Sequence, residues 1–365
     1  MADPDVTDVS HRPPDVLSDL RVPIVLAPLA GGPATVELAV AVADAGGLGF
    51  LAAGYKAPAL VREEIKAFRD RTAAPLGVNV FTPPAAPADE ASYAQYVQAV
   101  AREGARIGVQ AGAAVFDDDS FPAKLDLLAQ ARPEVASFVF GCPSEEVISR
   151  LRERGITVLV TVTTPEEARE AGAAGADGLV VQGLEAGGHR GSAINDDQPA
   201  YGLLSLLALV RAQVNLPLVA AGGIATGGGL AAALSAGAIA AQIGTAFLLC
   251  PEAGTAAVHR AAIASGTATA VTRAFTGKPA RGIVNRFMLE YSDRAPAAYP
   301  ELHHVTAPIR AAARKSGDPD LVNLWAGQTH ELARPEPAAD VVTRLIGQAR
   351  AALASAEQRL TAEAR

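Results

Sequence analysis

Short apolar runs that alternate with longer amphipathic stretches limit the folds open to this sequence more than any other feature. Eight such runs occur before residue 250, and Ala-rich segments with helical periodicity separate them. Eight strands with helices between them make up a closed parallel barrel. We therefore predict an α/β fold, a (β/α)8 TIM barrel. The runs span 22–29, 48–54, 76–81, 135–140, 156–162, 177–183, 216–223 and 238–247, with helices predicted near 35–45, 57–70, 91–103, 144–154, 165–174, 201–213 and 227–236.

The amino-acid composition agrees with strands that helices bury on both faces. Half of the residues are hydrophobic but only 5% are aromatic, so Ala, Val, Leu and Ile must build the core. A doubly wound open sheet is the rival architecture, and it usually carries a Gly-x-Gly-x-x-Gly motif directly after its first strand. The nearest candidate, Gly47-Leu-Gly49-Phe-Leu-Ala52, lies where a helix ends and a strand begins. We interpret it as a helix C-cap and turn.

The strand–helix alternation fades after residue 252, where Pro, Gly, Arg and His become frequent. We predict a smaller, mostly helical appendage over the barrel mouth. The expected domains are a barrel over 15–255, a helical substrate-covering region over 256–330 and a C-terminal helix over 331–365 that packs on the barrel. Residues 104–134 are less regular and predict an extra helix and loop before the fourth strand.

Charge and cysteine content argue against several classes of protein. The net charge is −8, and no Lys/Arg stripe with interleaved aromatics indicates a nucleic-acid partner. The two cysteines, Cys142 and Cys250, are too few for a disulfide framework or a zinc site, so we expect no metal. Residues 212–251 are uncharged but broken by Pro and Gly, which indicates buried elements and no membrane span. The polar N-terminus is unlike a secretory signal, so the cytoplasm is the expected location.

Candidate site residues follow the strands, because active sites of barrels lie at the carboxyl ends of their strands. Asn79 ends the third run and Gln182 the sixth, Gly222 and Gly223 follow the seventh, and Gln242–Thr245 follows the eighth. Glycine N–H groups can approach a phosphate closely, and a following helix N-terminus adds a favourable dipole. Each glycine alone could form a tight turn. Together, at one barrel end, they favour a phosphate site.

His189 lies in a Gly-rich loop after the sixth strand, where apolar periodicity does not explain it. A histidine there can hold or move a proton near neutral pH, and a structural hydrogen bond is the alternative. Several weaker candidates remain, each with a structural alternative. Tyr299, His303 and His304 either reach the barrel mouth or only pack and face water, and Lys278 and Arg281 either touch a phosphate or are solvated. Trp325 is interpreted as a packing anchor.

Five segments in order, across nearly the whole chain, resemble the nitronate monooxygenase family: residues 27–55, 77–81, 182–191, 217–248 and 323–328. The Gly-Tyr pair at 54–55 and the Trp-Ala-Gly-Gln run at 325–328 resemble its class I branch. The resemblance implies FMN-dependent oxidation of alkyl nitronates, such as propionate 3-nitronate, by O2 to carbonyl products and nitrite or nitrate. It implies that His189 is catalytic and that FMN is held by Asn79, Gln182, Gly187, Gly223, Gln242, Ile243, Gly244 and Thr245.

Two other functions stay open at this point. Flavin-dependent enoyl and quinone reductases share the barrel and much of the histidine loop, so an NAD(P)H-dependent FMN reductase is one alternative. A sugar-phosphate lyase or isomerase, or a non-catalytic binder, is the other, although such enzymes often use a strand-end Lys that is not seen here. The expected partners are an anionic nitronate and O2, with no nucleic acid or membrane, and a homodimer is one conceivable assembly.

Overall fold

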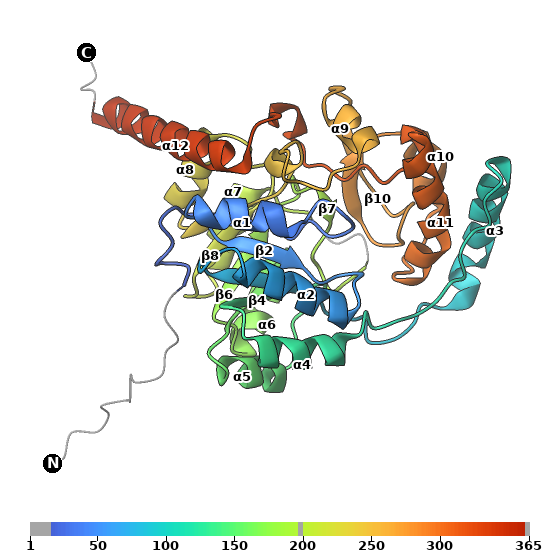
Figure 1. Cartoon of the computed structure of the whole chain (residues 1–365), viewed down its shortest axis with the longest axis horizontal. Coiled ribbons are helices and arrows are strands. Elements are labelled where there is room, and N and C mark those ends of the chain that lie inside the picture. The colour runs from blue at the N-terminus through green and yellow to red at the C-terminus, as the bar shows by residue number, and fades with distance from the viewer. Residues whose placement is uncertain (1–15, 196–199, 362–365) are drawn as a thin grey trace.

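A computed structural model describes residues 16–195 and 200–361 of the chain, and its centre is the predicted barrel (Figure 1). Eight parallel strands follow one another in the order β1-β9-β8-β6-β5-β4-β3-β2. A bridge between Val25 and Leu48 joins the two ends of this sheet. All eight apolar runs therefore form strands. The strands are β1 (Ile24–Leu26), β2 (Gly49–Ala52), β3 (Leu76–Phe81), β4 (Val135–Val139), β5 (Thr157–Val162), β6 (Gly178–Gln182), β8 (Leu218–Ala221) and β9 (Ala240–Ile243).

Helices cover the outside of the barrel, and every residue of β3 and β5 is buried as a result. The helix after β5 shows why the sequence forms these elements. Its N-cap Thr164 accepts a hydrogen bond from the Glu167 N–H, Pro165 occupies the first turn, and two glutamates lie near the positive end of the helix dipole. The covering helices are α1 (Val36–Asp44), α2 (Pro58–Arg69), α4 (Phe121–Ala131), α5 (Glu145–Arg152), α6 (Pro165–Ala173), α7 (Leu203–Arg211) and α8 (Gly227–Ser235).

A second, more aromatic core lies beside the barrel and contains α3 (Glu90–Arg106), α9 (Ala257–Ile263), α10 (Arg286–Tyr291) and α11 (Glu301–Ser316). Figure 1 shows α3 next to α11, away from the other helices of the N-terminal half. The buried side of α3 carries Tyr93 and Tyr96, and the Tyr96 hydroxyl donates to the carbonyl of Ala274 at 2.6 Å. The barrel surface between β3 and β4 is instead covered by α4, in the segment 104–134 that the sequence left irregular.

The appendage also holds a small antiparallel sheet that the sequence analysis did not predict. Its order is β10-β11-β7, with β7 (Gly188–His189), β10 (Thr269–Thr272) and β11 (Ala280–Ile283). The two-residue strand β7 belongs to the loop after β6, and its His189 pairs with Ala280. This pairing attaches the histidine loop of the barrel to the second core.

The C-terminal helix α12 (Ala338–Thr361) packs on α8 and α1. Its Gln348 side chain accepts a hydrogen bond from the Gly227 N–H at the start of α8, at 3.1 Å. Among the described residues, no helix is long and apolar enough to cross a membrane. Short 3-10 helices complete the chain at Thr245–Phe247, Ser292–Arg294, Pro319–Leu321 and His330–Leu332.

Candidate active site

A cavity of about 460 Å³ opens at the carboxyl ends of the barrel strands, under the second core. Its volume lies within the range of about 300–1,000 Å³ that is typical of ligand sites. The structure brings every candidate for the cofactor and the reaction to its wall. These residues are Asn79, Gln182, Gly187, His189, Gly222, Gly223, Gln242, Ile243, Gly244 and Thr245.

Glycines and backbone groups form one end of the cavity. Gly223 has φ +66°, a conformation that favours glycine, and it is the second residue after β8. A Cβ atom on Gly187 would lie 2.5 Å from the backbone of Ala326 and Gly327, so only glycine permits these two chain segments to approach. The Thr329 hydroxyl donates to the Gly223 carbonyl at 3.0 Å. Residues 326–329 therefore close against the glycine end.

The amide side chains at the strand ends have different tasks. Gln182 accepts from the Gly191 N–H at 2.7 Å and donates to the His189 carbonyl at 3.1 Å, so it holds the histidine loop. Asn79 donates to the hydroxyl and carbonyl of Ser137. The Gln242 side-chain oxygen is buried and has no hydrogen-bond partner among the described residues. An unsatisfied buried acceptor is costly, so a ligand with N–H or O–H donors fits this cavity.

His189 lies at the opposite, aromatic end. One ring nitrogen, Nε2, is 2.9 Å from the Thr276 hydroxyl, and the ring lies 5.5–5.8 Å from the rings of Phe140, Tyr299 and Trp325. The imidazole is reached from the cavity but lies beneath the molecular surface. Burial, with the positive charges of Lys278 and Arg310, lowers the pKa of His189 to about 3. The ring is therefore neutral at physiological pH.

Tyr55 is held at this end by the irregular segment 104–134. The backbone of Tyr55 has φ +64°, which is uncommon for a residue with a Cβ atom, and its N–H donates to the Asp119 carboxylate at 3.0 Å. Its ring stacks on His303 with centroids 4.1 Å apart, and its hydroxyl accepts from Tyr299 at 3.2 Å. The side chains that resisted assignment from sequence, Tyr299 and His303, thus form one aromatic group with His189.

The charges on the cavity wall are positive. Of the described residues that line it, Arg310 and Arg314 are the arginines or lysines, and none is an aspartate or glutamate. Burial, together with the charge of Arg310, lowers the pKa of His303 to about 2, and burial raises the pKa of Tyr55 to about 12. The aromatic end therefore combines neutral rings with a guanidinium charge.

The remaining candidates lie off this wall. Lys278 is buried and donates to the Ser192 carbonyl at 2.7 Å, Arg281 donates to the Leu184 carbonyl at 2.9 Å, and His304 pairs with Asp117 at 2.5 Å. Trp325, which we expected only to pack, lines the cavity. Sequence reasoning did not single out Phe81 or Phe140, although each ends a predicted strand, because an apolar side chain there also fits the core. Thr276 and Arg310 follow no predicted strand.

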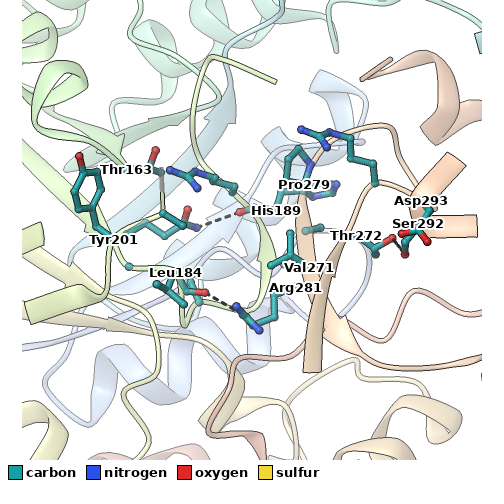
Figure 2. Close-up of a pocket in the computed structure, with 18 residues that line it drawn as sticks. Thr163, Leu184, His189, Tyr201, Val271, Thr272, Pro279, Arg281, Ser292 and Asp293 are labelled. Carbon is teal, nitrogen blue, oxygen red and sulfur yellow. Dashed lines mark hydrogen bonds between the residues drawn. The ribbon is translucent and has the colours of Figure 1, made fainter. Parts of the chain in front are cut away.

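A second cavity of about 450 Å³ adjoins the first and shares Gln182, Ala186, Gly188 and His189 with it. Figure 2 shows this space between the histidine loop and strands β10 and β11. Arg281 binds the Leu184 carbonyl across it, and Thr272 contacts Ser292 at 2.7 Å. Both residues of β7, Gly188 and His189, therefore line the two cavities at once.

Comparison with known proteins finds one family model, curated relatives that share its name, and solved structures of similar fold. The profile described as nitronate monooxygenase matches residues 15–348. The nitronate monooxygenase of Pseudomonas aeruginosa is 40% identical over 350 residues, which cover 92% of this chain and 98% of that protein. The crystal structure of a nitroalkane oxidase from Streptomyces ansochromogenes is 47% identical, covers 93% of this chain and 99% of its own, and has a TM-score of 0.91. FabK from Thermotoga maritima is 25% identical, with 94% and 97% coverage and a TM-score of 0.74.

Proposed function

We propose, from the premise that the chain belongs to the nitronate monooxygenase family, that it oxidises alkyl nitronates with O2 at the cavity described above, with FMN as its flavin. The observation that carries this proposal is the convergence of His189 and the strand-end glycines on one cavity. The products expected are a carbonyl compound and nitrite or nitrate.

In this proposal the flavin and the substrate bind towards different ends of the cavity. We assign the phosphate of FMN to the backbone around Gly222, Gly223, Gly244 and Thr245, and the ring to the region of Asn79, Gln182 and Gln242. The orphan oxygen of Gln242 supports this assignment, because the flavin ring and the ribityl chain carry N–H and O–H donors. Bound flavin supplies the electron transfer between substrate and O2.

His189 is the proton acceptor in this proposal. Its Nε2 atom is engaged with Thr276, and Nδ1 has no hydrogen-bond partner among the residues that the structure describes. Burial keeps the ring neutral, so its free nitrogen can accept a proton from a neutral nitroalkane, although the low pKa makes it a weak base for that step. A nitronate has already lost that proton and needs only to be oriented over the flavin.

The test begins with the purified protein. We expect a yellow protein that releases FMN on denaturation and consumes O2 with ethyl nitronate and with propionate 3-nitronate. A colourless protein that does not take up added FMN would overturn the cofactor assignment. Absence of O2 consumption in the flavin-loaded protein would overturn the reaction.

The likeness to FabK at the level of the whole fold makes an NADH or NADPH control necessary. Anaerobic mixing of the flavin-loaded protein with each nucleotide should leave the flavin absorbance unchanged on the time scale of nitronate turnover. Rapid bleaching of the flavin would instead favour a reductase that takes its electrons from the nucleotide.

A further inference from the structure

Arg310 is a buried cation without a carboxylate partner. The residue is 6% exposed and lies on α11, on the cavity wall. Its Nε donates to the Thr306 hydroxyl at 3.0 Å and its Nη2 to the His303 carbonyl at 2.8 Å. Its Nη1 has two N–H groups and one partner among the described residues, the Asn323 side-chain oxygen at 3.3 Å. All of these partners are neutral.

A guanidinium group held this way is destabilising. Burial removes its hydration, and neutral hydrogen bonds replace only part of it. No aspartate or glutamate among the described residues lies within 4 Å of the Arg310 guanidinium. The cavity is the remaining side from which a negative charge can reach this group. An anionic ligand would therefore remove the imbalance.

Contacts place Arg310 at the aromatic end, away from the phosphate glycines. Its Nη2 also lies 3.3 Å from the ring nitrogen of His303, which stacks on Tyr55. Its charge acts on the pKa of His189 directly. The glycine end contacts a later part of the same segment. Thr329 bonds to Gly223 and Gly327 to Thr245, whereas Asn323 bonds to Arg310. The guanidinium therefore faces the substrate region.

We infer that Arg310 binds the negatively charged nitro group of a nitronate, and that this residue makes the enzyme select nitronates over neutral nitroalkanes. The inference rests on the proposed function. The two substrate forms differ by one proton, and relatives of this chain bear names from both chemistries. A nitronate is planar, with two oxygens that share the charge, which suits the fork of a guanidinium. The neutral rings of His189, His303, Tyr55 and Tyr299 cannot supply this discrimination.

The kinetic test compares R310M and R310K with the wild type, using freshly prepared ethyl nitronate and nitroethane. We expect R310M to lower kcat/KM for ethyl nitronate by about a hundredfold but to raise the KM of nitroethane by less than about threefold, since only ethyl nitronate is an anion when it binds. R310K, which keeps a point charge, should retain an intermediate preference. R314M removes the neighbouring arginine, and a larger loss of preference there than in R310M would overturn the assignment.

A binding measurement tests the same residue without turnover. Propionate is a planar anion of similar size, and propionamide is its neutral counterpart. Trp325 is the single tryptophan of the chain and lines the cavity, so its fluorescence reports occupancy. We expect propionate to bind at least about tenfold more weakly to R310M than to the wild type, with propionamide unchanged. Equal weakening of both probes would mean that Arg310 only shapes the cavity.

Four further outcomes can be told apart. If R310M loses FMN while it remains folded by circular dichroism, Arg310 serves the cofactor and the inference fails. If R310M does not fold, R310Q, which keeps amide donors without the charge, replaces it in both assays. If the wild type oxidises neither substrate but still prefers propionate through Arg310, the proposed reaction fails and the anion site stands. If the wild type oxidises nitronates and R310M keeps the same preference, only the anion site falls.

Discussion

His189 owes its neutrality to its surroundings, because it is buried among aromatic rings and the positive charges of Lys278 and Arg310 disfavour its protonated form. A histidine with an ordinary pKa would be partly protonated below pH 7, whereas this ring stays neutral. The same surroundings make the ring a poor source of positive charge. We therefore propose His189 as the base and Arg310 as the counter-charge.

Replacement of His189 should therefore separate the two substrate forms. In His189→Asn we expect kcat/KM for nitroethane to fall by at least about 100-fold, because removal of a general base costs about that much. Oxidation of ethyl nitronate, which needs no base, should stay within about tenfold of the wild type. Oxygen uptake measures both. An equal loss with both substrates would show that His189 only orients what binds, and no loss with either would remove it from the reaction.

The residues named from sequence differ from those found by structure in a consistent way. Strand ends and glycine pairs were predictable, because a barrel sends the ends of all its strands to one rim. Arg310, Thr276 and Phe140 were not, because they reach the cavity through tertiary packing. Tyr299 lies just before α11 and His303 in its first turn, yet their spacing alone does not say whether they face a cavity or solvent.

The turn between β8 and α8 shows how an element carries a function in its backbone. Gly223 adopts a left-handed conformation there, and a Cβ atom would also lie 2.9 Å from Glu185. The Glu185 carboxylate in turn accepts the Leu203 N–H at 3.1 Å at the start of α7. Gly223 therefore packs closely against Glu185, and Glu185 in turn holds the first turn of α7.

We expect Gly223→Ala to reduce the amount of flavin that copurifies with the protein. The matched control is Gly155→Ala, at a turn with φ +78° where a Cβ atom meets nothing within 4 Å. Both changes should cost about 1 kcal/mol of stability through the backbone conformation, and Gly223→Ala somewhat more because its Cβ atom would lie 2.9 Å from Glu185. Only Gly223→Ala should lower flavin absorbance per chain. Equal flavin content in the two variants would contradict a phosphate site at this turn.

Elements of regular length were predictable from sequence, and short or displaced ones were not. Each apolar run became a barrel strand because burial on both faces leaves a continuous signal. The strand β7 has two residues in a Gly-rich loop, so no periodicity could reveal it. Helix α3 was predicted as a helix, but its packing on α11 depends on a loop path that local pattern does not encode.

The whole molecule consists of the barrel core and the smaller aromatic core, with α12 as a brace outside the barrel. The inner face of α12 packs through Val341, Val342 and Leu345, all buried. Through Gln348 the same helix holds the first turn of α8, which follows the glycine turn. Stability of this distant helix therefore supports one wall of the cavity.

A pair of leucines on α12 tests this support. Leu345 is 0% exposed and Leu353 is 43% exposed. Leu345→Ala should lower the free energy of unfolding by about 2–5 kcal/mol, because it leaves a cavity in the core. Leu353→Ala should change it by less than about 1 kcal/mol. Urea unfolding followed by circular dichroism measures both, and similar losses in the two variants would mean that α12 is not anchored by its inner face.

Buried neutral histidines should also make the folded protein sensitive to acid. Burial lowers the pKa of His259 to about 4, while an unfolded histidine has a pKa of about 6.5. Between these values the unfolded chain binds more protons, so stability falls as the pH falls from about 6.5 towards 4. By pH 5 this residue should have cost about 2 kcal/mol. In His259→Gln, unfolded in urea at pH 7.5 and pH 5 at equal flavin occupancy, the pH-dependent loss should shrink by that amount. An unchanged loss would contradict it.

His189 belongs to the barrel by its place in the chain and to the appendage by its strand pairing with Ala280. The glycines of the cavity follow the barrel strands and are also held by residues 326–329. The distance between His189 and the proposed flavin site therefore depends on how the barrel and the second core pack against each other. Substitutions deep in the aromatic core, which touch no ligand, offer a way to retune reactivity while affinity is preserved. An isolated barrel would keep the strand-end glycines of the proposed flavin site, but it would lose the strand pairing that positions His189.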